Sequence, residues 1–461
     1  MRKKDHVRAE SYELSRSTPA AGGYLARLIH EHRLALCPEC LAEWDKLAGL
    51  RGEYLARLGG LHARPAPPSE IPADELSGSR TSRQRQEETV AELTSHLLAA
   101  KQDFWELGRT PHDQWRRKVR HARCRFRSRP LAELLIEKCR KTVRADPEAA
   151  RKLAELVPLV LDWTRGAGGP SWAPALLARA EAYRANALRV AGELQEAAAV
   201  FIDLRRRIGR RPLGDARVLG EIASLEASLC TAQRRFDETE EFLERAAMFF
   251  EAVGDRVGVA RVRIKQGNLG QSLQRPEAAI WAHSEAAEIL ISLDKPQDLY
   301  LFICTVNGRA NALCDLGRHA EAADLLAAHL DDYEGCEEPH VAATLRCLQA
   351  RVDLGFERWA AAAESFADAG AAMAALGRLY DAAIMILYEA EAHHGAGRLD
   401  ELRRLAGPLV EVFRAKGVAG EASKALHLFR DAVVGQRLSA SLLAELRQRL
   451  DRSRPAALPP G

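Results

Sequence analysis

Residues 299–334 read LYLFICTVNGRANALCDLGRHAEAADLLAAHLDDYE and contain two helical patterns separated by a glycine. Apolar residues recur at helical spacing on both sides of Gly317. They are Leu301, Val306, Ala310 and Leu313 before it, and Ala322, Leu325, Leu326 and Leu330 after it. Because glycine commonly ends a helix, the stretch predicts two antiparallel helices joined by a short turn at Gly317.

The same turn recurs along most of the chain. Six stretches combine a turn residue with a Glu-Ala or related pair: Gly192–Ala197, Arg234–Thr239, Gln274–Ala279, Gly317–Ala322, Glu357–Ala362 and Gly397–Leu402. Their last residues stand 42, 40, 43, 40 and 40 positions apart, and a weaker seventh stretch ends at Ala150. One helix pair cannot cover its own apolar face, so this period predicts stacked pairs that share a continuous core.

A second small residue precedes each of the six turns. It lies twelve positions before the last residue of each stretch, at Ala185, Ala227, Gly267, Ala310, Ala350 and Ala390. Small residues at these positions allow the two helices of a pair to approach closely. The composition agrees with an all-helical chain, because aromatic residues make up only 6% and good helix formers dominate.

This pattern resembles the tetratricopeptide repeat (TPR), which has small residues at the corresponding positions and a bulky residue four positions after the last one. Here the bulky residues are Phe201, Leu243, Leu326 and Phe366, and the period is near 41. The resemblance implies a right-handed α-solenoid of about seven TPR-like helix pairs over residues 130–435. It also implies a groove that binds a peptide or protein partner, in a scaffold or regulatory adaptor.

Polar residues follow the small position of several first helices. They are Asn186, Asn268 and Asn311, and Arg261, Lys265 and Gln271 belong to the same helix as Asn268. Amides can pair with the backbone of an extended ligand, and the basic residues favour an acidic peptide or a C-terminal carboxylate. Alternatively, these amides form hydrogen bonds between adjacent repeats and hold the stack together.

The amino-terminal segment 1–60 carries a possible metal site. Cys37-Pro-Glu-Cys40 places two thiolates at a spacing that can bind one zinc ion, and His32 lies about a turn and a half of helix before Cys37. His30 competes with His32, and His6 is a distant candidate for a fourth ligand. The alternative is a pair of thiols at a helix junction without metal.

The same residues resemble the zinc-binding anti-sigma-factor domain, whose signature is His, three residues, Cys, two residues, Cys. Four residues separate His32 from Cys37 here. The resemblance implies a small helical zinc-knuckle domain with one zinc ion. It also implies a sigma factor or another transcription protein as a partner, and so a link to transcription regulation.

A Pro- and Ser-rich linker is predicted at residues 61–84, followed by a helical arm at 85–129. The arm contains a run from Trp115 to Arg129 with eight Lys or Arg residues and no acid. Its candidates for contact with nucleic acid are Arg116, Arg117, Lys118 and Arg120. In that alternative function the chain is a transcription regulator and the repeats are its sensor. The run could instead be solvated or lie against acidic residues elsewhere.

The composition and the absence of certain motifs exclude several other classes of protein. The 461 residues carry a formal net charge of only +3, and no uncharged stretch is long enough to span a membrane. We find no signal for export, and nine scattered cysteines fit a reducing cytoplasm. Phosphate-binding loops, dinucleotide fingerprints and nucleophile elbows are absent, so we expect no enzyme activity.

Residues 436–452 are expected to form a capping helix and residues 453–461 a disordered tail.

Overall fold

The structure is a computed structural model that describes residues 76–111, 114–121, 126–164, 169–293, 298–405, 421–435 and 438–453. Within these ranges the secondary structure is helical and contains no strand, which confirms the expected fold class. No helix in this part of the chain is long and apolar enough to cross a membrane. The candidate zinc ligands His32, Cys37 and Cys40 lie outside the described residues.

The chain divides into two compact units, Met1–Ala99 and Ala100–Gly461. The described part of the first unit is helical and belongs to α4 (Leu76–Gly108). This helix includes Ser77-Gly-Ser79, which falls within the predicted linker. No proline interrupts the chain between Pro72 and Pro111, so the helix begins before the predicted arm does.

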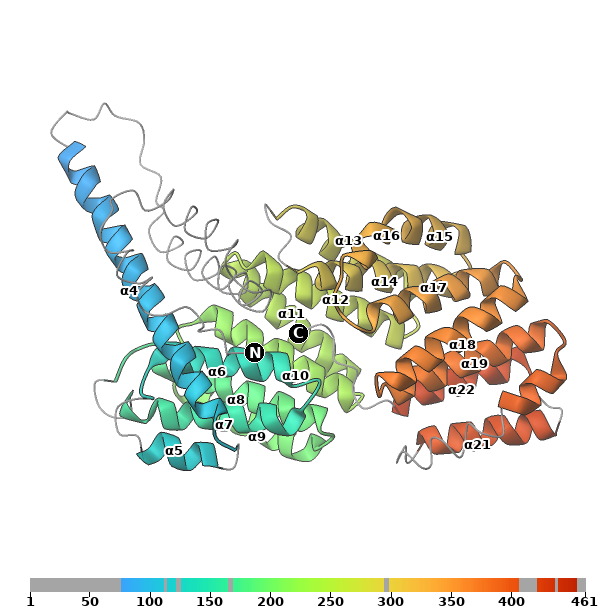
Figure 1. Cartoon of the computed structure of the whole chain (residues 1–461), viewed down its shortest axis with the longest axis horizontal. Helices are drawn as coiled ribbons and strands as arrows, with labels where there is room; N and C mark the ends of the chain where they lie inside the picture. Colours follow the sequence, from blue (N-terminus) through green and yellow to red (C-terminus); the bar gives the residue numbers. More distant parts are fainter. Residues whose placement is uncertain are drawn as a thin grey trace, which may run out of the picture. The chain divides into compact units, whose positions relative to one another are not determined.

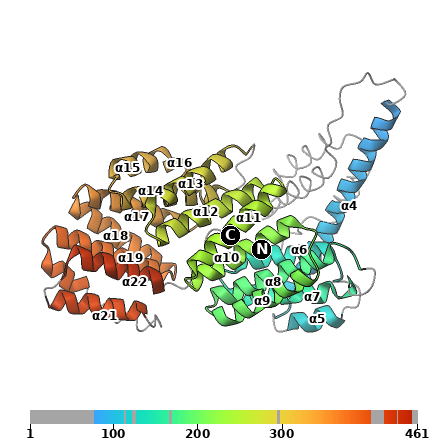
Figure 2. The ribbon, with the colours of Figure 1, turned by 180° about the vertical axis from the view of Figure 1, so that it is seen from behind.

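The second unit is a series of helix pairs that follow one another in chain order (Figures 1 and 2). After the short α5 (Trp115–His121), six pairs are complete within the described residues, and α19 (Leu379–Gly395) begins a seventh. The first helices are α6 (Arg129–Thr142), α8 (Ala173–Val190), α10 (Ala216–Ala232), α12 (Arg256–Ser272), α14 (Leu299–Asp315) and α17 (Val341–Gly355). The second helices are α7 (Pro147–Val160), α9 (Leu194–Arg210), α11 (Phe236–Ala252), α13 (Pro276–Ile291), α15 (His319–Ala328) with α16 (Leu330–Glu334), and α18 (Trp359–Ala375).

All six predicted turns have the same backbone geometry. The first residue of each turn has a positive φ, between 57° and 87°, at Gly192, Arg234, Gln274, Gly317, Glu357 and Gly397. The next residue then donates its N–H to a carbonyl five residues earlier, as Arg318 does to Leu313 at 2.9 Å. This is the Schellman ending of an α-helix, and it explains why glycine occupies three of the six positions.

The small residues and the bulky residues that define the repeat are buried. Ala185, Ala227, Ala310, Ala350 and Ala390 are at most 1% exposed, and Phe201, Leu243, Leu326 and Phe366 are at most 2% exposed. The hydrophobic core therefore runs through successive pairs, as the period predicts. At roughly 25 cal/mol per Å² of buried apolar surface, each buried Phe or Leu contributes about 2 kcal/mol before the cost of ordering the chain.

Aromatic rings of second helices pack directly against glycines of first helices. The ring of Phe250 in α11 fits between Gly220 of α10 and Gly258 of α12, where a Cβ would lie 2.9 Å and 2.6 Å from ring atoms. His283 of α13 lies in the same way between Gly267 of α12 and Gly308 of α14. Only glycine leaves room for these rings, so these two joints between neighbouring pairs depend on glycines and a ring.

The first helices line the inner side of this unit. Each first helix from α8 to α17 contacts the first helix of the following pair. In a curved stack the helices on the shorter, inner side lie closest to their counterparts in the neighbouring pairs. The inner face is therefore formed by α8, α10, α12, α14 and α17.

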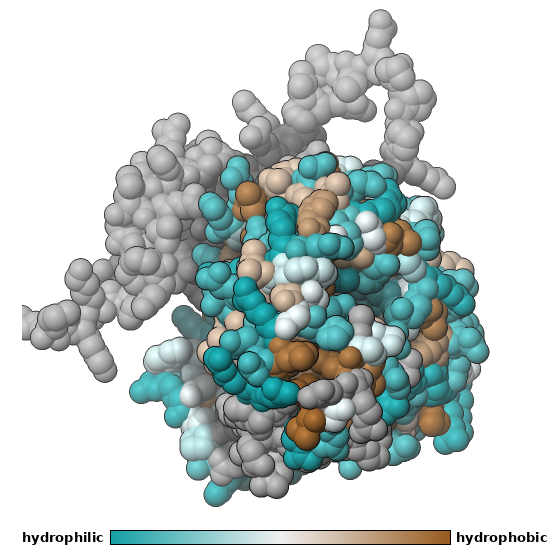
Figure 3. Space-filling model, turned by 90° about the vertical axis from the view of Figure 1, so that its right-hand side faces the viewer, coloured by the Kyte–Doolittle hydropathy of each residue, from teal (hydrophilic) through white to brown (hydrophobic). Residues whose placement is uncertain are grey.

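The carboxy-terminal helices of the unit share one hydrophobic cluster with α17, α18 and α19. Helices α21 (Glu421–Val434) and α22 (Ala440–Ser453) contact each other, and α22 also packs on α19. Phe429, Leu443, Leu446 and Leu450 are completely buried there. Figure 3 faces this end of the unit and shows hydrophobic residues gathered near its middle. Leu376, Leu399 and Leu428 are exposed apolar residues of this part of the chain.

Candidate functional site

Lys265 is the central polar residue of the inner face. In its protonated form its Nζ donates to three oxygens of the first helix of the preceding pair: the Ser224 carbonyl at 2.8 Å, the Ser224 hydroxyl at 2.7 Å and the Ser228 hydroxyl at 3.0 Å. All three oxygens are neutral. Within the described part of the chain, no carboxylate lies within ion-pair distance of this amine.

The environment of Lys265 disfavours its charged form. Burial lowers its pKa from 10.5 to about 7, and the positive charges of Arg189 and Arg261 act in the same direction. Near neutral pH the amine is therefore divided between its neutral and protonated forms. A lysine in such a state gains its charge readily when an anion approaches it.

Arg189 of α8 is a buried arginine next to this site. Its side chain is only 2% exposed, and its Nε and Nη2 atoms donate to Asn186 Oδ1 at 3.0 Å and 2.8 Å. Burial and the nearby Arg144 lower the pKa of Arg189 to about 10. The amide of Asn186 thus orients a buried cation, and this use of Asn186 differs from the backbone recognition that the sequence suggested.

Arg261 occupies the first turns of α12, on the same face. Its closest acidic group is Asp298, at 3.9 Å from Nη2, and the Nε atom of Arg261 is buried without a hydrogen-bond partner among the described residues. Asp298 also caps α14, because its Oδ1 accepts the Leu301 N–H at 3.0 Å. The carboxylate is therefore shared, and it only partly neutralises Arg261.

A bridge between distant repeats lies near these cations. Arg144, in the turn between α6 and α7, donates from Nη1 to the hydroxyl of Tyr300 in α14 at 3.2 Å. The same hydroxyl lies 3.1 Å from His340 Nε2, at the start of α17. Burial, Arg378 and Arg144 lower the pKa of His340 to about 4, so the ring is neutral at neutral pH.

Further along the inner face, charges are balanced by carboxylates. Arg351 of α17 donates to Asn311 Oδ1 at 2.6 Å and to Asp315 Oδ1 at 2.7 Å, both in α14. Arg447 of α22 pairs with Glu391 of α19. Between α8 and α14, by contrast, Lys265 has no carboxylate within ion-pair distance among the described residues.

Comparison with solved structures places this arrangement among known folds. A Rap protein complexed with competence and sporulation factor has a similar structure, with a TM-score of 0.54 and 13% sequence identity, covering 70% of this chain and 87% of that protein. The second unit is a TPR-like helical solenoid.

Two further solved structures show weaker similarity. The apo form of RapI has a TM-score of 0.46 and 10% identity over 70% of this chain and 97% of that protein. BtubC (BKLC) from P. vanneervenii has a TM-score of 0.39 and 18% identity over 52% of this chain and 92% of that protein. No family model matches the sequence, and no curated protein matches it.

Four of the six residues proposed for the groove, Arg261, Lys265, Asn268 and Gln271, lie on one helix, α12. Arg261, Lys265 and Gln271 are polar residues of α12, and Gln271 Nε2 donates to the Gly308 carbonyl of α14 at 2.9 Å. Asn268 is half-buried on the same helix. Asn311 is bound to Arg351 of the following repeat, as the alternative interpretation of the amides expects.

Sequence reasoning missed Arg144, Arg189 and the two serines of α10. Arg189 stands four positions after the small residue Ala185, just as Gln271 stands four after Gly267, so alignment of the repeats could have found it. Ser224 and Ser228 likewise belong to inner-face positions of α10. For Arg144 the sequence holds no such signal, because only the path of the solenoid brings it near Tyr300.

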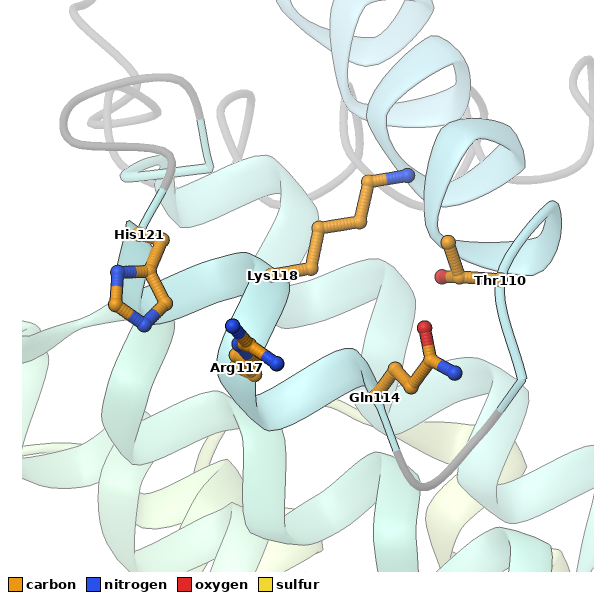
Figure 4. A pocket seen from close by; sticks show the side chains of 5 residues that line it. All are labelled: Thr110, Gln114, Arg117, Lys118 and His121. Carbon is orange, nitrogen blue, oxygen red and sulfur yellow. The ribbon is translucent and has the colours of Figure 1, made fainter.

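The basic arm lies at the start of the second unit. Trp115 and Val119 of α5 are buried, whereas Arg116, Arg117 and Arg120 belong to its outward-facing positions. Arg116 lies 3.8 Å from Glu155, and Lys118 Nζ donates to the Glu106 carbonyl at 2.5 Å and lies 3.7 Å from the Glu106 carboxylate. Figure 4 shows Arg117, Lys118 and His121 of α5 around an open pocket, with Gln114 and Thr110. Two of the four proposed nucleic-acid contacts therefore lie against glutamates.

Proposed function

We propose that this protein is a non-enzymatic adaptor that binds a peptide or protein partner on the inner face of its solenoid, at α8, α10, α12 and α14. The observation that carries the proposal is the group of polar and basic side chains on this face, centred on Lys265, whose hydrogen-bond acceptors in the described part of the chain are neutral oxygens. Maintaining such a site costs stability, and that cost is typical of functional surfaces.

The similarity to the Rap protein supports this proposal at the level of the fold. That protein was solved in complex with competence and sporulation factor, so a helical stack of this kind can hold a second molecule. The inner faces of solenoids offer extended concave surfaces, which suit a partner in an extended conformation. A link to transcription regulation stays a prediction from the amino-terminal segment.

A peptide library tests the proposed function. Phage-displayed random heptapeptides are selected on the full chain, and each binder is then measured against Lys265→Glu and against Arg210→Glu. Arg210 is an exposed residue of α9 and serves as the matched control. We expect binders that lose at least tenfold in affinity with Lys265→Glu and are unchanged with Arg210→Glu. Selection that yields no binder, or binders indifferent to Lys265→Glu, contradicts the proposal.

The amino-terminal zinc site is a separate proposal. His32, Cys37 and Cys40 would hold one zinc ion through an imidazole nitrogen and two thiolates, the ligand types that zinc prefers. Full-length protein should contain about one zinc ion per chain, and Cys37→Ser with Cys40→Ser should lose it. Metal-free protein that retains its helical circular dichroism would contradict the ligand assignment.

A further inference from the structure

Two second helices of neighbouring pairs each carry a large apolar side chain that is exposed. Met248 of α11 and Trp281 of α13 are both 56% exposed, although each lies inside its helix. Single apolar residues are common on protein surfaces, so exposure alone assigns no role to either side chain. Their positions in the repeat and their neighbours distinguish these two residues from such cases.

The repeat supplies equivalent residues with which Trp281 can be compared. It lies two positions after Ala279, the last residue of its turn stretch. At this position the other five repeats have small or charged residues, all of them exposed: Ala199, Glu241, Asp324, Glu364 and Arg404. The position therefore faces solvent in every repeat, and packing of the stack does not require a tryptophan there.

Met248 departs from its own set of equivalent residues in the same way. It lies nine positions after Thr239, the last residue of its turn stretch. The equivalent residues that the structure describes are again exposed and small or charged: Arg206, Glu288, Asp331 and Ala371. Methionine and aromatic residues are enriched at protein interfaces. Two successive pairs thus carry an interface type of residue where the other repeats carry a small or charged one.

One arginine lies between the helices that carry these two residues. Arg263 of α12 has its Nη2 atom 3.7 Å from Glu251 Oε1 of α11 and its Nε atom 2.7 Å from Glu285 Oε2 of α13. Its guanidinium carbon also lies 5.6 Å from the centre of the Trp281 ring. Glu251 follows Met248 by about one turn of helix, so Met248 and Trp281 flank the same arginine.

Unpaired acids accompany both apolar residues. Glu244 lies four positions before Met248, and Glu288 lies seven positions after Trp281, so each acid shares the helix face of its apolar neighbour. Both glutamates are exposed, and neither has an ion pair in the part of the chain that the structure describes. Each helix face therefore combines one apolar side chain with a free negative charge.

Other basic residues near these helices are engaged elsewhere. Arg245, the basic residue of α11, lies over the ring of Phe242 at 5.4 Å, and Arg205 of α9 lies over the same ring. Arg245 is thus directed toward the preceding pair. Arg275, just before α13, pairs with Glu240 at 3.4 Å. Neither arginine forms an ion pair with Glu244 or Glu288 in the described part of the chain.

We propose that these residues form a docking surface for a basic amphipathic helix of a protein partner. The surface, here called the outer patch, consists of Glu244, Met248, Glu251, Arg263, Trp281, Glu285 and Glu288. Apolar side chains of the partner cover Met248 and Trp281, and its lysines or arginines pair with Glu244 and Glu288. The outer patch uses no residue of the inner face, so it is a second binding surface beyond the proposed function.

The charge of the outer patch selects this kind of partner. Four glutamates and one arginine give it a net negative charge, which repels a phosphate backbone or an anionic bilayer. An amphipathic helix carries an apolar stripe bordered by charged residues. With basic borders, that arrangement is complementary to two apolar side chains accompanied by glutamates, and the exposed tryptophan supplies the large apolar contact that dominates many interfaces.

Fluorescence anisotropy with a labelled helical probe tests the proposal on the full chain. The probe is a peptide of about 18 residues, five turns of helix, made of leucine, lysine and alanine with its leucines on one face. Its control has the same composition but has its leucines distributed around the helix. We expect the probe to bind at least about tenfold more tightly than the control peptide, and to bind more weakly as salt screens its lysines.

Matched variants locate the binding on the chain. Trp281→Ser and Glu288→Lys should each weaken binding of the probe by about tenfold. Glu364→Lys changes the net charge by the same amount at an exposed position of α18 that is equivalent to Trp281, and it should bind like the wild type. Since all three side chains are exposed, the fold should be unchanged, which circular dichroism and thermal unfolding check.

Three results would overturn the proposal. Equal binding of the two peptides, or no binding of either, would show that the outer patch does not recognise an amphipathic helix. An effect of Glu364→Lys as large as that of Glu288→Lys would mean that the probe responds only to overall charge. Sedimentation that reveals self-association abolished by Trp281→Ser would assign the outer patch to a second copy of this chain. None of these measurements alters a residue of the inner face, so the proposed function there is tested separately.

Discussion

Arg144 and Tyr300 lie 156 residues apart in the sequence, and the guanidinium of the first donates a 3.2 Å hydrogen bond to the hydroxyl of the second. In a simple solenoid each repeat contacts only its neighbours. Here the turn of the first described pair meets the fifth pair, through a hydroxyl that also lies beside His340. The solenoid therefore contains a contact between helix pairs that are not neighbours in the stack.

Removing this bridge should produce a small, non-additive loss of stability. Tyr300→Phe deletes the hydroxyl and keeps the ring, so we expect the free energy of unfolding to fall by about 1 kcal/mol. Arg144 forms the solvent-exposed side of the bond, so Arg144→Ala alone should cost less. A double-mutant cycle measured by urea unfolding should give a coupling of about 0.5 kcal/mol. Strictly additive effects would mean that the bond contributes nothing in solution.

Replacing Lys265 should stabilise the protein. A lysine with a folded pKa near 7 and an unfolded pKa near 10.5 gives up a proton on folding at neutral pH, which opposes folding. Lys265→Met removes this cost, so its free energy of unfolding should exceed that of the wild type by about 2 kcal/mol at pH 7.

The sign of the pH dependence checks the cause. Between pH 7 and pH 10.5 the unfolded wild type holds the proton and the folded wild type does not, so wild-type stability rises with pH in this window. The advantage of Lys265→Met over the wild type should therefore shrink as the pH rises from about 7 to about 9. An advantage that stays constant over this range would show that the pKa of Lys265 is not depressed.

The backbone geometry of the turns predicts that two substitutions change the free energy of unfolding in opposite directions. Gly317 has a φ of 71° and Gln274 has a φ of 57°, in the left-handed region that disfavours residues with a Cβ. Gly317→Ala should lower the free energy of unfolding by about 1 kcal/mol, and Gln274→Gly should raise it by up to about 1 kcal/mol.

Gly209 provides the control for this pair. It lies inside α9 without a positive φ, and a Cβ added there would meet no neighbouring atom within 4 Å. Gly209→Ala should raise stability by roughly 0.5–1 kcal/mol, because alanine is the better helix former. Thermal unfolding of the three variants compares them directly. A stabilising Gly317→Ala would contradict the turn geometry.

Because the pKa of His283 is lowered, we predict that the protein loses stability in mild acid. Burial and the nearby Arg309 lower its pKa to about 4, and neither ring nitrogen has a hydrogen-bond partner among the described residues. The unfolded chain binds a proton below pH 6.5 while the folded chain does not, so stability falls as the pH falls from 6.5 toward 4. His283 alone should account for about 2 kcal/mol between roughly pH 7.5 and pH 5.

The comparison must isolate His283, because His340 has a pKa shifted in the same direction. His283→Leu replaces the titratable ring with an apolar side chain of similar size between Gly267 and Gly308. Urea unfolding at several pH values should show that this variant loses about 2 kcal/mol less than the wild type on acidification to about pH 5. Parallel pH profiles for the two proteins would remove His283 as a cause.

The repeats were predictable from the sequence because their signals are local. A residue such as Gly317 ends a helix by its own backbone preference, and a small residue such as Ala310 permits close packing wherever its helix lies. These preferences need no knowledge of distant residues. The three turns that begin with Arg234, Gln274 and Glu357 were found through the repeat period, since their first residues carry no such preference.

The candidate site was less predictable because it depends on distances between repeats. The pattern identified Arg261 and Lys265 as basic residues of one helix, but it did not show that serines of α10 hold the amine. It also gave no indication that Asn311 binds Arg351. Residues such as Arg144 become relevant only through the curvature of the stack, which accumulates over several pairs.

Phe250, seated between Gly220 and Gly258, joins the same two first helices that carry Ser224 and Lys265. A methyl group at Gly220 or Gly258 would lie 2.9 Å or 2.6 Å from atoms of the ring, so we expect α10 and α12 to move apart. The serine hydroxyls would then withdraw from the amine. The volume of one phenyl ring thus sets the spacing of α10 and α12 beside the candidate site, and divergence at this joint would change that spacing without altering Ser224 or Lys265 themselves.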